Sequence, residues 1–321
     1  MKPTQGPARL PTYKELPLHL GLPVSWNLFG NEDSIGMLNT QTDERIARAA
    51  GLVTKGKLFA LDRGTELMAA GSLFNRGTPR HRVFRTPSGA LDDVLDNYYP
   101  QGSSQWDSLA HVPAFPDVFY NASSLREVLD TGRCCISAAA RKGIAGRGVL
   151  VDLGRMLYDR QDDYCPGESC AISVEELQDA VASTKQRLET GDVLLMRTGW
   201  IEWYESLPLA RRQDLARSGN LKAVGLEHSE RMAEYLWDSH VAAVAADCPA
   251  LEVWPPDHGK PFGFLHHALI GRLGIMLGEL WWLDELAADC HADGRYECFV
   301  VSAPWNVPRG IGSPANALAF K

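Results

Sequence analysis

The chain has 321 residues, of which 45% are hydrophobic and 22% charged, and this ordinary globular composition excludes disordered, collagen-like and coiled-coil proteins. Its formal charge of -8 argues against a partner with an extended negative charge, so we expect neither nucleic acid nor a membrane surface to bind. No apolar run reaches the roughly 18 residues of a membrane helix, and the first residues lack the apolar segment of a secretory signal, which predicts a cytoplasmic protein.

The first half of the chain has little periodicity. Its first ~25 residues are polar and rich in Pro, which predicts an extended arm lying on the body or on a neighbouring subunit, ahead of a single domain over residues 26–321. A short helix is predicted over residues 42–50 and a strand over residues 58–61. Residues 76–100 are rich in Arg, Asp, Gly and Tyr without clear periodicity, and they are predicted as a long loop.

The second half of the chain alternates apolar runs with helical patterns. Ser173 and Glu176 form an S-x-x-E capping box, which predicts the start of a helix. Alternating strands and helices are typical of an α/β layer with some parallel pairing. The expected elements are strands at 147–153, 192–197 and 241–246, and helices at 173–188 and 227–239.

Several common motifs are absent from the sequence. It contains no G-x-S-x-G elbow, no Walker A sequence and no H-E-x-x-H. Gly143, Gly146 and Gly148 precede a strand instead of following one, so we interpret them as turn residues and not as a dinucleotide-binding loop. Seven cysteines without a CxxC pair predict reduced, mostly buried thiols.

Residues 101–111, QGSSQWDSLAH, concentrate polar groups in one short segment. In an extended conformation alternate side chains share a face, so Gln101, Ser103, Gln105, Asp107 and His111 could converge. Taken alone, Asp107 fits a capping or turn residue equally well, and a single histidine such as His111 is most often structural.

This segment resembles the H-x-G-T-H-x-D-x-P-x-H signature of the cyclase or kynurenine-formamidase-like family of metal hydrolases. Three further segments resemble the same family in the same order: WNLFGNEDSIGMLN at 26–39, HHALIGRLGIMLGELWWLDEL at 266–286, and APWNV with GSPANALA in the tail. The resemblance therefore covers nearly the whole chain. It implies an α/β fold of the swivelling β/β/α type, with a central mixed sheet flanked by helices.

The resemblance also assigns roles to residues. Asp107 falls on a metal ligand that can bridge two ions, and His111 on the general acid/base. His266, or as second choice His267, and Glu279 fall on the downstream ligands, although these residues could also be polar groups on a helix and strand. Trp26 takes the place of a substrate-facing aromatic. Further candidate substrate contacts are Ser104, Trp106, Tyr98 and Phe119. The two aromatics that flank the segment, Tyr98 and Phe119, could equally well contribute to packing alone.

The departures from the signature concern its first two histidines, which are Gln101 and Gln105 here. An amide oxygen binds Zn more weakly than an imidazole nitrogen does. We therefore expect one divalent ion, Zn or Mn, held by Asp107, Glu279 and one His, with the two Gln as weaker candidate ligands.

The implied activity is metal-assisted hydrolysis of an amide, formamide or lactone in a small, flat aromatic or cyclic substrate, by a homo-oligomer that is a dimer or a tetramer. Two alternatives stay open. One is a lyase or dehydratase on the same scaffold. The other is a non-catalytic binding protein that has lost the enzyme's ligands.

Overall fold

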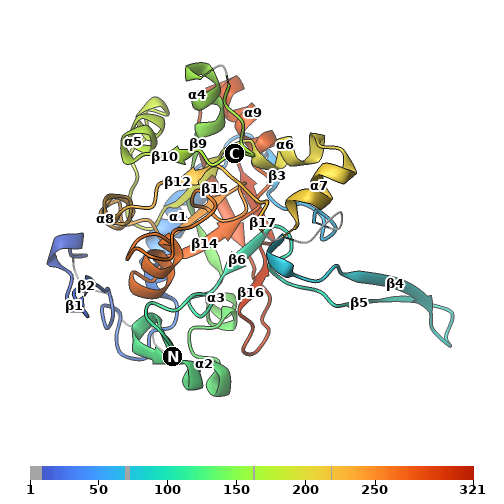
Figure 1. Cartoon of the computed structure of the whole chain (residues 1–321), viewed down its shortest axis with the longest axis horizontal. Helices are drawn as coiled ribbons and strands as arrows, with labels where there is room; N and C mark the ends of the chain where they lie inside the picture. Colours follow the sequence, from blue (N-terminus) through green and yellow to red (C-terminus); the bar gives the residue numbers. More distant parts are fainter. Residues whose placement is uncertain (1–8, 69–72, 162, 218) are drawn as a thin grey trace.

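The computed structural model describes residues 9–68, 73–161, 163–217 and 219–321. A nine-stranded mixed sheet forms the centre of this part of the chain, and helices surround it (Figure 1). From one edge to the other its strands are β16 (Gly312–Pro314), β6 (Gln105–Asp107), β14 (Met276–Glu279), β13 (Ala243–Ala246), β11 (Val193–Arg197), β9 (Ile144–Asp152), β15 (Glu297–Ser302), β17 (Ala317–Phe320) and β3 (Leu58–Ala60).

The middle of the sheet is parallel and its flanks are antiparallel. Strands β14, β13, β11 and β9 run parallel to one another, whereas β6 and β16 on one side and β15, β17 and β3 on the other pair antiparallel. Every residue of β13 and β14 is buried, as is expected of strands covered on both faces. The predicted strands at 147–153, 192–197 and 241–246 correspond to these central strands, with ends shifted by up to three residues.

The helices of the described residues lie between and beside these strands. They are α1 (Asp43–Ala50), α2 (Leu125–Thr131), α3 (Ile136–Lys142), α4 (Leu153–Arg160), α5 (Val174–Ser183), α6 (Trp200–Ser206), α7 (Leu209–Leu215), α8 (Glu230–Asp238) and α9 (Asp284–Asp293). The capping box predicted at Ser173 and Glu176 is present at the start of α5. The predicted end of this helix near residue 188 is wrong, because Thr184 already caps it and Lys185 takes a φ of 60°.

The loop predicted over residues 76–100 is largely a hairpin. Strands β4 (Arg80–Arg85) and β5 (Leu91–Asp96) pair in register and project from the body (Figure 1). The first strand is basic and the second acidic, so opposite charges meet across the pair, as at Arg80 and Asp96. Both faces of the hairpin are largely exposed, so no alternation of apolar and polar residues marked it in the sequence.

Two of the three glycines interpreted as turn residues lie inside strand β9. Gly143 does end a helix, α3, but Gly146 and Gly148 belong to the strand that follows. A Cβ at Gly148 would come within 2.4 Å of Val300 Cγ2. The absence of a side chain there allows the neighbouring strand to pack closely, which explains the glycine without a turn.

The remaining short elements belong to the predicted arm and to connections. The described part of the arm packs on α8, where Tyr13 N–H donates to Asp238 Oδ1 over 2.6 Å and Trp237 Nε1–H to the Pro11 carbonyl over 2.9 Å. The first eight residues of the arm lie outside the described residues. The remaining short strands are β1 (Leu18–His19), β2 (Leu22–Pro23), β7 (Val118–Phe119), β8 (Ser123–Ser124), β10 (Ala171–Ile172) and β12 (Gly225–Leu226).

The described helices include none that is both long and apolar enough to cross a membrane. All seven cysteines are free thiols, and five of them are buried, as the composition predicted.

Candidate metal centre

The centre is built where strands β6 and β14 pair. Antiparallel register places Gln105 directly opposite Glu279, and Asp107 two residues further along on the same face. Gln105 Nε2 donates to Glu279 Oε2 over 2.6 Å. Both strands lie inside the sheet, and these three residues are at most 3% exposed. Two polar strand faces thus meet in the interior of the protein.

A third side chain, His266, reaches the same point from a helical segment. The carboxylate of Glu252 accepts hydrogen bonds from the backbone N–H groups of Leu265 and His266, which begin that segment. It also lies 2.5 Å from His266 Nδ1, so Nε2 is directed at Glu279 Oε1 over 3.0 Å and lies 3.9 Å from Asp107 Oδ2. The segment continues as a π-helix over His267–Arg272, a distortion frequent at functional sites.

The electrostatics of this acidic centre, defined as Asp107, His266 and Glu279, are unusual. Both carboxylate oxygens of Asp107 are buried and make no hydrogen bond within the described residues. Burial and the nearby Glu279 raise the pKa of Asp107, although His111 and His266 oppose this. Burial also disfavours the charged form of His266, but Glu252 and Glu279 outweigh it and raise its pKa to about 10. Positive charge is strongly favoured here.

A divalent cation fits this arrangement. One ligand atom from each residue of the acidic centre lies within 4.8 Å of the others. Asp107 offers two unpaired oxygens, and the unpartnered Oε1 of Gln105 adds a weak donor beside them. A buried polar atom without a partner is costly unless a ligand satisfies it. A mixed carboxylate and imidazole set suits Zn and also Mn.

His111 lies at the edge of the centre. Its Nε2 is 3.7 Å from Asp107 Oδ1, and its side chain is 24% exposed, far more than any side chain of the acidic centre. Burial lowers its pKa, and attraction to Asp107 only partly offsets this. A neutral imidazole that lies next to the acidic centre and is open to solvent can accept a proton.

Of the two neighbouring histidines, and likewise of the two glutamines, the structure places one in the acidic centre and one outside it. His266 enters the acidic centre, whereas His267 Nδ1 contacts the Pro113 carbonyl at 2.6 Å. Gln105 lies in the centre, whereas the Gln101 amide packs against β16, where a Cβ on Gly312 would come within 2.5 Å of Gln101 Nε2. Within the described residues, the Gln101 amide has no hydrogen bond to the acidic centre.

The predicted substrate contacts are spread over the surroundings. Trp26 Nε1–H donates to the Gly271 carbonyl, so this ring packs on the π-helix. Ser104 accepts from Arg63 N–H, and Tyr98 packs on Trp305.

Four of these five candidates, all except Tyr98, are buried. Trp106 is fully buried against Trp281, and Phe119 lies buried in β7. The roles predicted for these side chains in substrate binding stay predictions.

Sequence reasoning missed Glu252. It lies in the apolar run Ala250–Val253 and is fully buried. One carboxylate oxygen accepts a hydrogen bond from Leu265 N–H at the start of the helical segment, and the other contacts His266 Nδ1. A carboxylate that orients a ligand histidine is a usual partner of a metal centre. The only signal available was an acidic residue inside an apolar run, which does not identify the histidine that it contacts.

Glu252→Gln is expected to weaken metal binding about 10- to 100-fold, because the amide removes the charge that orients His266. Competition with a chelator of known affinity measures this effect. Glu285→Gln, on the exposed face of α9, is the matched control and should bind metal as the natural protein does. If Glu252→Gln binds metal with unchanged affinity, the role of Glu252 is only to cap the helical segment.

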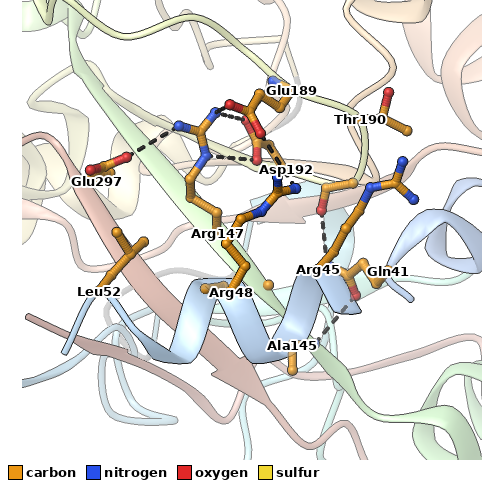
Figure 2. A pocket seen from close by; sticks show the side chains of 13 residues that line it. Gln41, Arg45, Arg48, Leu52, Ala145, Arg147, Glu189, Thr190, Asp192 and Glu297 are labelled. Atoms are coloured by element: carbon orange, nitrogen blue, oxygen red, sulfur yellow. Dashed lines mark hydrogen bonds and ion pairs between the residues drawn. The ribbon is translucent and has the colours of Figure 1, made fainter. Parts of the chain in front are cut away.

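A separate hollow of about 170 Å³ lies between α1 and β9 (Figure 2). It contains none of the residues of the acidic centre. Its charges are used within the protein, since Arg147 bonds Asp192 over 3.0 Å and Glu297 over 3.1 Å. We interpret this hollow as a surface feature of an ion-pair network.

Comparison with known proteins is consistent with this geometry. A family model described as "Putative cyclase" matches residues 72–253. A crystal structure described as a novel cyclase is 32% identical, with a TM-score of 0.79, and the match covers 93% of this chain and 99% of that one. The mixed α/β fold that the sequence predicted is thereby confirmed.

More distant structures share the fold alone. Isatin hydrolase A from Labrenzia aggregata, bound to benzyl benzoate, is 14% identical with a TM-score of 0.59, over 84% of this chain and 94% of that one. Isatin hydrolase A from Ralstonia solanacearum is 16% identical with a TM-score of 0.58, over 86% and 95%. None of the curated proteins matches the chain.

Proposed function

The chain belongs to the cyclase family, and from this premise we propose that it is a metal-dependent hydrolase. The bond cleaved is an amide, formamide or lactone in a small, flat aromatic or cyclic molecule. The observation that carries the proposal is the buried Asp107 carboxylate, which accepts no hydrogen bond from the described residues. It lies next to Glu279 and to the oriented Nε2 of His266. The isatin hydrolases with the same fold act on isatin, as their name states; isatin contains a cyclic amide, so they support the same reaction class.

Each residue of the centre has a part in this chemistry. Asp107, His266 and Glu279 would hold one divalent ion, Zn or Mn, with Gln105 beside them. When bound, such an ion supplies a water of lowered pKa and polarises the scissile carbonyl. His111 accepts the proton of the attacking water at its imidazole and returns it to the leaving nitrogen or oxygen. Glu252 keeps His266 in the orientation that presents Nε2.

The experiment combines metal analysis with isotope labelling. The purified protein is analysed for bound metal and then incubated in heavy-oxygen water with cyclic amides, N-formyl arylamines and aromatic lactones. Hydrolysis must place solvent oxygen in the carboxylic acid product. Turnover without solvent oxygen would indicate the lyase alternative. A chain without metal and without turnover would indicate a binding protein.

The two glutamines lead to a prediction about stoichiometry. The natural protein should retain about one tightly bound ion per chain, because Gln101 and Gln105 stand where the family signature has two imidazoles. The double variant Gln101→His, Gln105→His should gain Zn toward a second equivalent, because Asp107 has a free oxygen to share. Elemental analysis after dialysis against Zn measures both proteins. Two ions in the natural protein, or no gain in the variant, would contradict this account.

Two further predictions belong to the same proposal. A homo-oligomer, dimer or tetramer, remains a prediction that sedimentation analysis can check. A cytoplasmic location remains a prediction as well, and the seven free thiols fit the reducing conditions of that compartment.

A further inference from the structure

Arg76 is a cation near the acidic centre that has no ion-pair partner within the described residues. Its guanidinium donates to the Gln101 carbonyl, and this is the only hydrogen bond of that group among the described residues. Burial lowers its pKa, while attraction to Glu279 and Asp107 opposes the decrease, which places the charge within electrostatic reach of both carboxylates. A guanidinium has five N–H donors, so most donors of Arg76 have no partner in the part of the chain that the structure describes.

The backbone before Arg76 is bent in an unusual way. Phe74 and Asn75 have φ angles of 59° and 57°, two consecutive left-handed residues that are not glycine. Arg76 N–H closes the bend by donating to the Leu73 carbonyl over 3.2 Å. Such conformations cost free energy and are concentrated at binding and catalytic sites. The bend holds Arg76 where the base of the β4–β5 hairpin meets Gln101.

An aromatic strip, defined as Phe74, Trp254 and Phe264, joins Arg76 to the acidic centre. The Arg76 guanidinium lies 5.0 Å from the Phe74 ring centre. Phe74 and Trp254 are 4.9 Å apart, Trp254 and Phe264 6.5 Å, both edge to face. Phe264 then stacks on the His266 imidazole at 4.6 Å. All three rings of the strip are half-buried, so each keeps some surface for a ligand.

We propose that Arg76 and the aromatic strip bind a flat aromatic or heterocyclic substrate that carries a carboxylate. The inference rests on the proposed function, since the acidic centre supplies the reaction at the far end of the strip. The rings of the strip contact the flat part of the substrate, and Arg76 binds its carboxylate.

A carboxylate is the group that fits these observations best. Its two oxygens match the planar fork of a guanidinium, which binds them through two parallel hydrogen bonds. A chain with a formal charge of -8 and two buried carboxylates nearby otherwise repels an anion, so the local cation decides whether such a substrate binds.

Binding is measured by calorimetry with two probes of the same shape, quinoline-2-carboxylate and quinoline-2-carboxamide. The natural protein should prefer the acid by roughly tenfold to hundredfold, as expected of a charge-assisted contact. Arg76→Gln should remove the preference, and Arg76→Lys should retain part of it. Arg82→Gln, which removes an exposed arginine of the hairpin, is the control and should keep the full preference.

A second variant separates this inference from the proposed function. A carboxylate could also bind a metal ion, so the same titrations are made with Asp107→Asn. A preference for the acid that persists in Asp107→Asn and disappears in Arg76→Gln supports Arg76, even if the protein proves not to be a hydrolase. A preference that disappears in Asp107→Asn, or survives in Arg76→Gln, or is absent from the natural protein overturns the inference.

Discussion

Asp107→Asn is expected to abolish both metal retention and turnover. The amide keeps the shape of the side chain but removes the charge and one of the two unpartnered oxygens that the centre offers a cation. Because the bound ion would supply several kcal/mol of transition-state stabilisation, the rate should fall by roughly a thousandfold or more. Elemental analysis and a hydrolysis assay on the same preparation measure the two effects together.

The same substitution should stabilise the protein once metal has been removed from both forms. The ionised carboxylate of Asp107 is buried without a hydrogen bond from any described residue, which destabilises the folded state, and asparagine removes the cost of that buried charge. The chelated variant should therefore melt at a higher temperature than the chelated natural protein.

Asp247→Asn is the matched control for this substitution. Its carboxylate is equally buried but accepts hydrogen bonds from Thr198 and Gly199, so this variant should melt lower and keep its metal. A fully metallated and active Asp107→Asn would place the metal elsewhere.

His111→Ala should separate metal binding from catalysis. Because His111 lies beside Asp107 but outside the acidic centre, the variant should retain its ion. Loss of the residue that moves the proton should slow turnover by roughly 10² to 10⁴. Elemental analysis and kcat under saturating substrate give the two quantities independently.

His267→Ala provides the comparison for His111→Ala. Its ring is bound to the Pro113 carbonyl, so its removal should leave the metal content unaltered. Loss of the ion from His111→Ala would make His111 a ligand. Loss of the ion from His267→Ala would make that histidine the ligand in place of His266.

The parts of the fold that sequence could predict are those with strong local signals. The capping box at Ser173 predicts the start of α5 and the apolar run of β13 predicts a buried strand, and the structure contains both elements. The β4–β5 hairpin was missed because its stability comes from charges that meet across two strands, which periodicity along one strand does not report. Gly148 was misinterpreted for a related reason, since its role depends on Val300 in another strand.

In the acidic centre, too, some residues could be identified from the sequence, whereas others depend on contacts that only the folded chain makes. Asp107, His266 and Glu279 were named from the resemblance to a family. Pairing of β6 with β14 explains why Asp107 and Glu279, so distant in sequence, share a face. His266 joins them from the helical segment whose start contacts Glu252. Glu252 and Arg76 were not named, because each acts through a contact that only the folded chain creates. No pattern in the sequence shows that the Arg76 charge forms no ion pair with the other described residues.

The position of β6 has a consequence for synthesis of the protein. This strand lies between β14 and β16, and Gln105 meets Glu279 across a separation of 174 residues. A chain emerging from the ribosome therefore carries Asp107 for most of its elongation without the strands that enclose it. Contacts of such long range form slowly, so the centre should be among the last parts to assemble. Ion capture would then follow synthesis of β14 and β16, and metal supply would govern activation of the folded protein without guiding its early folding.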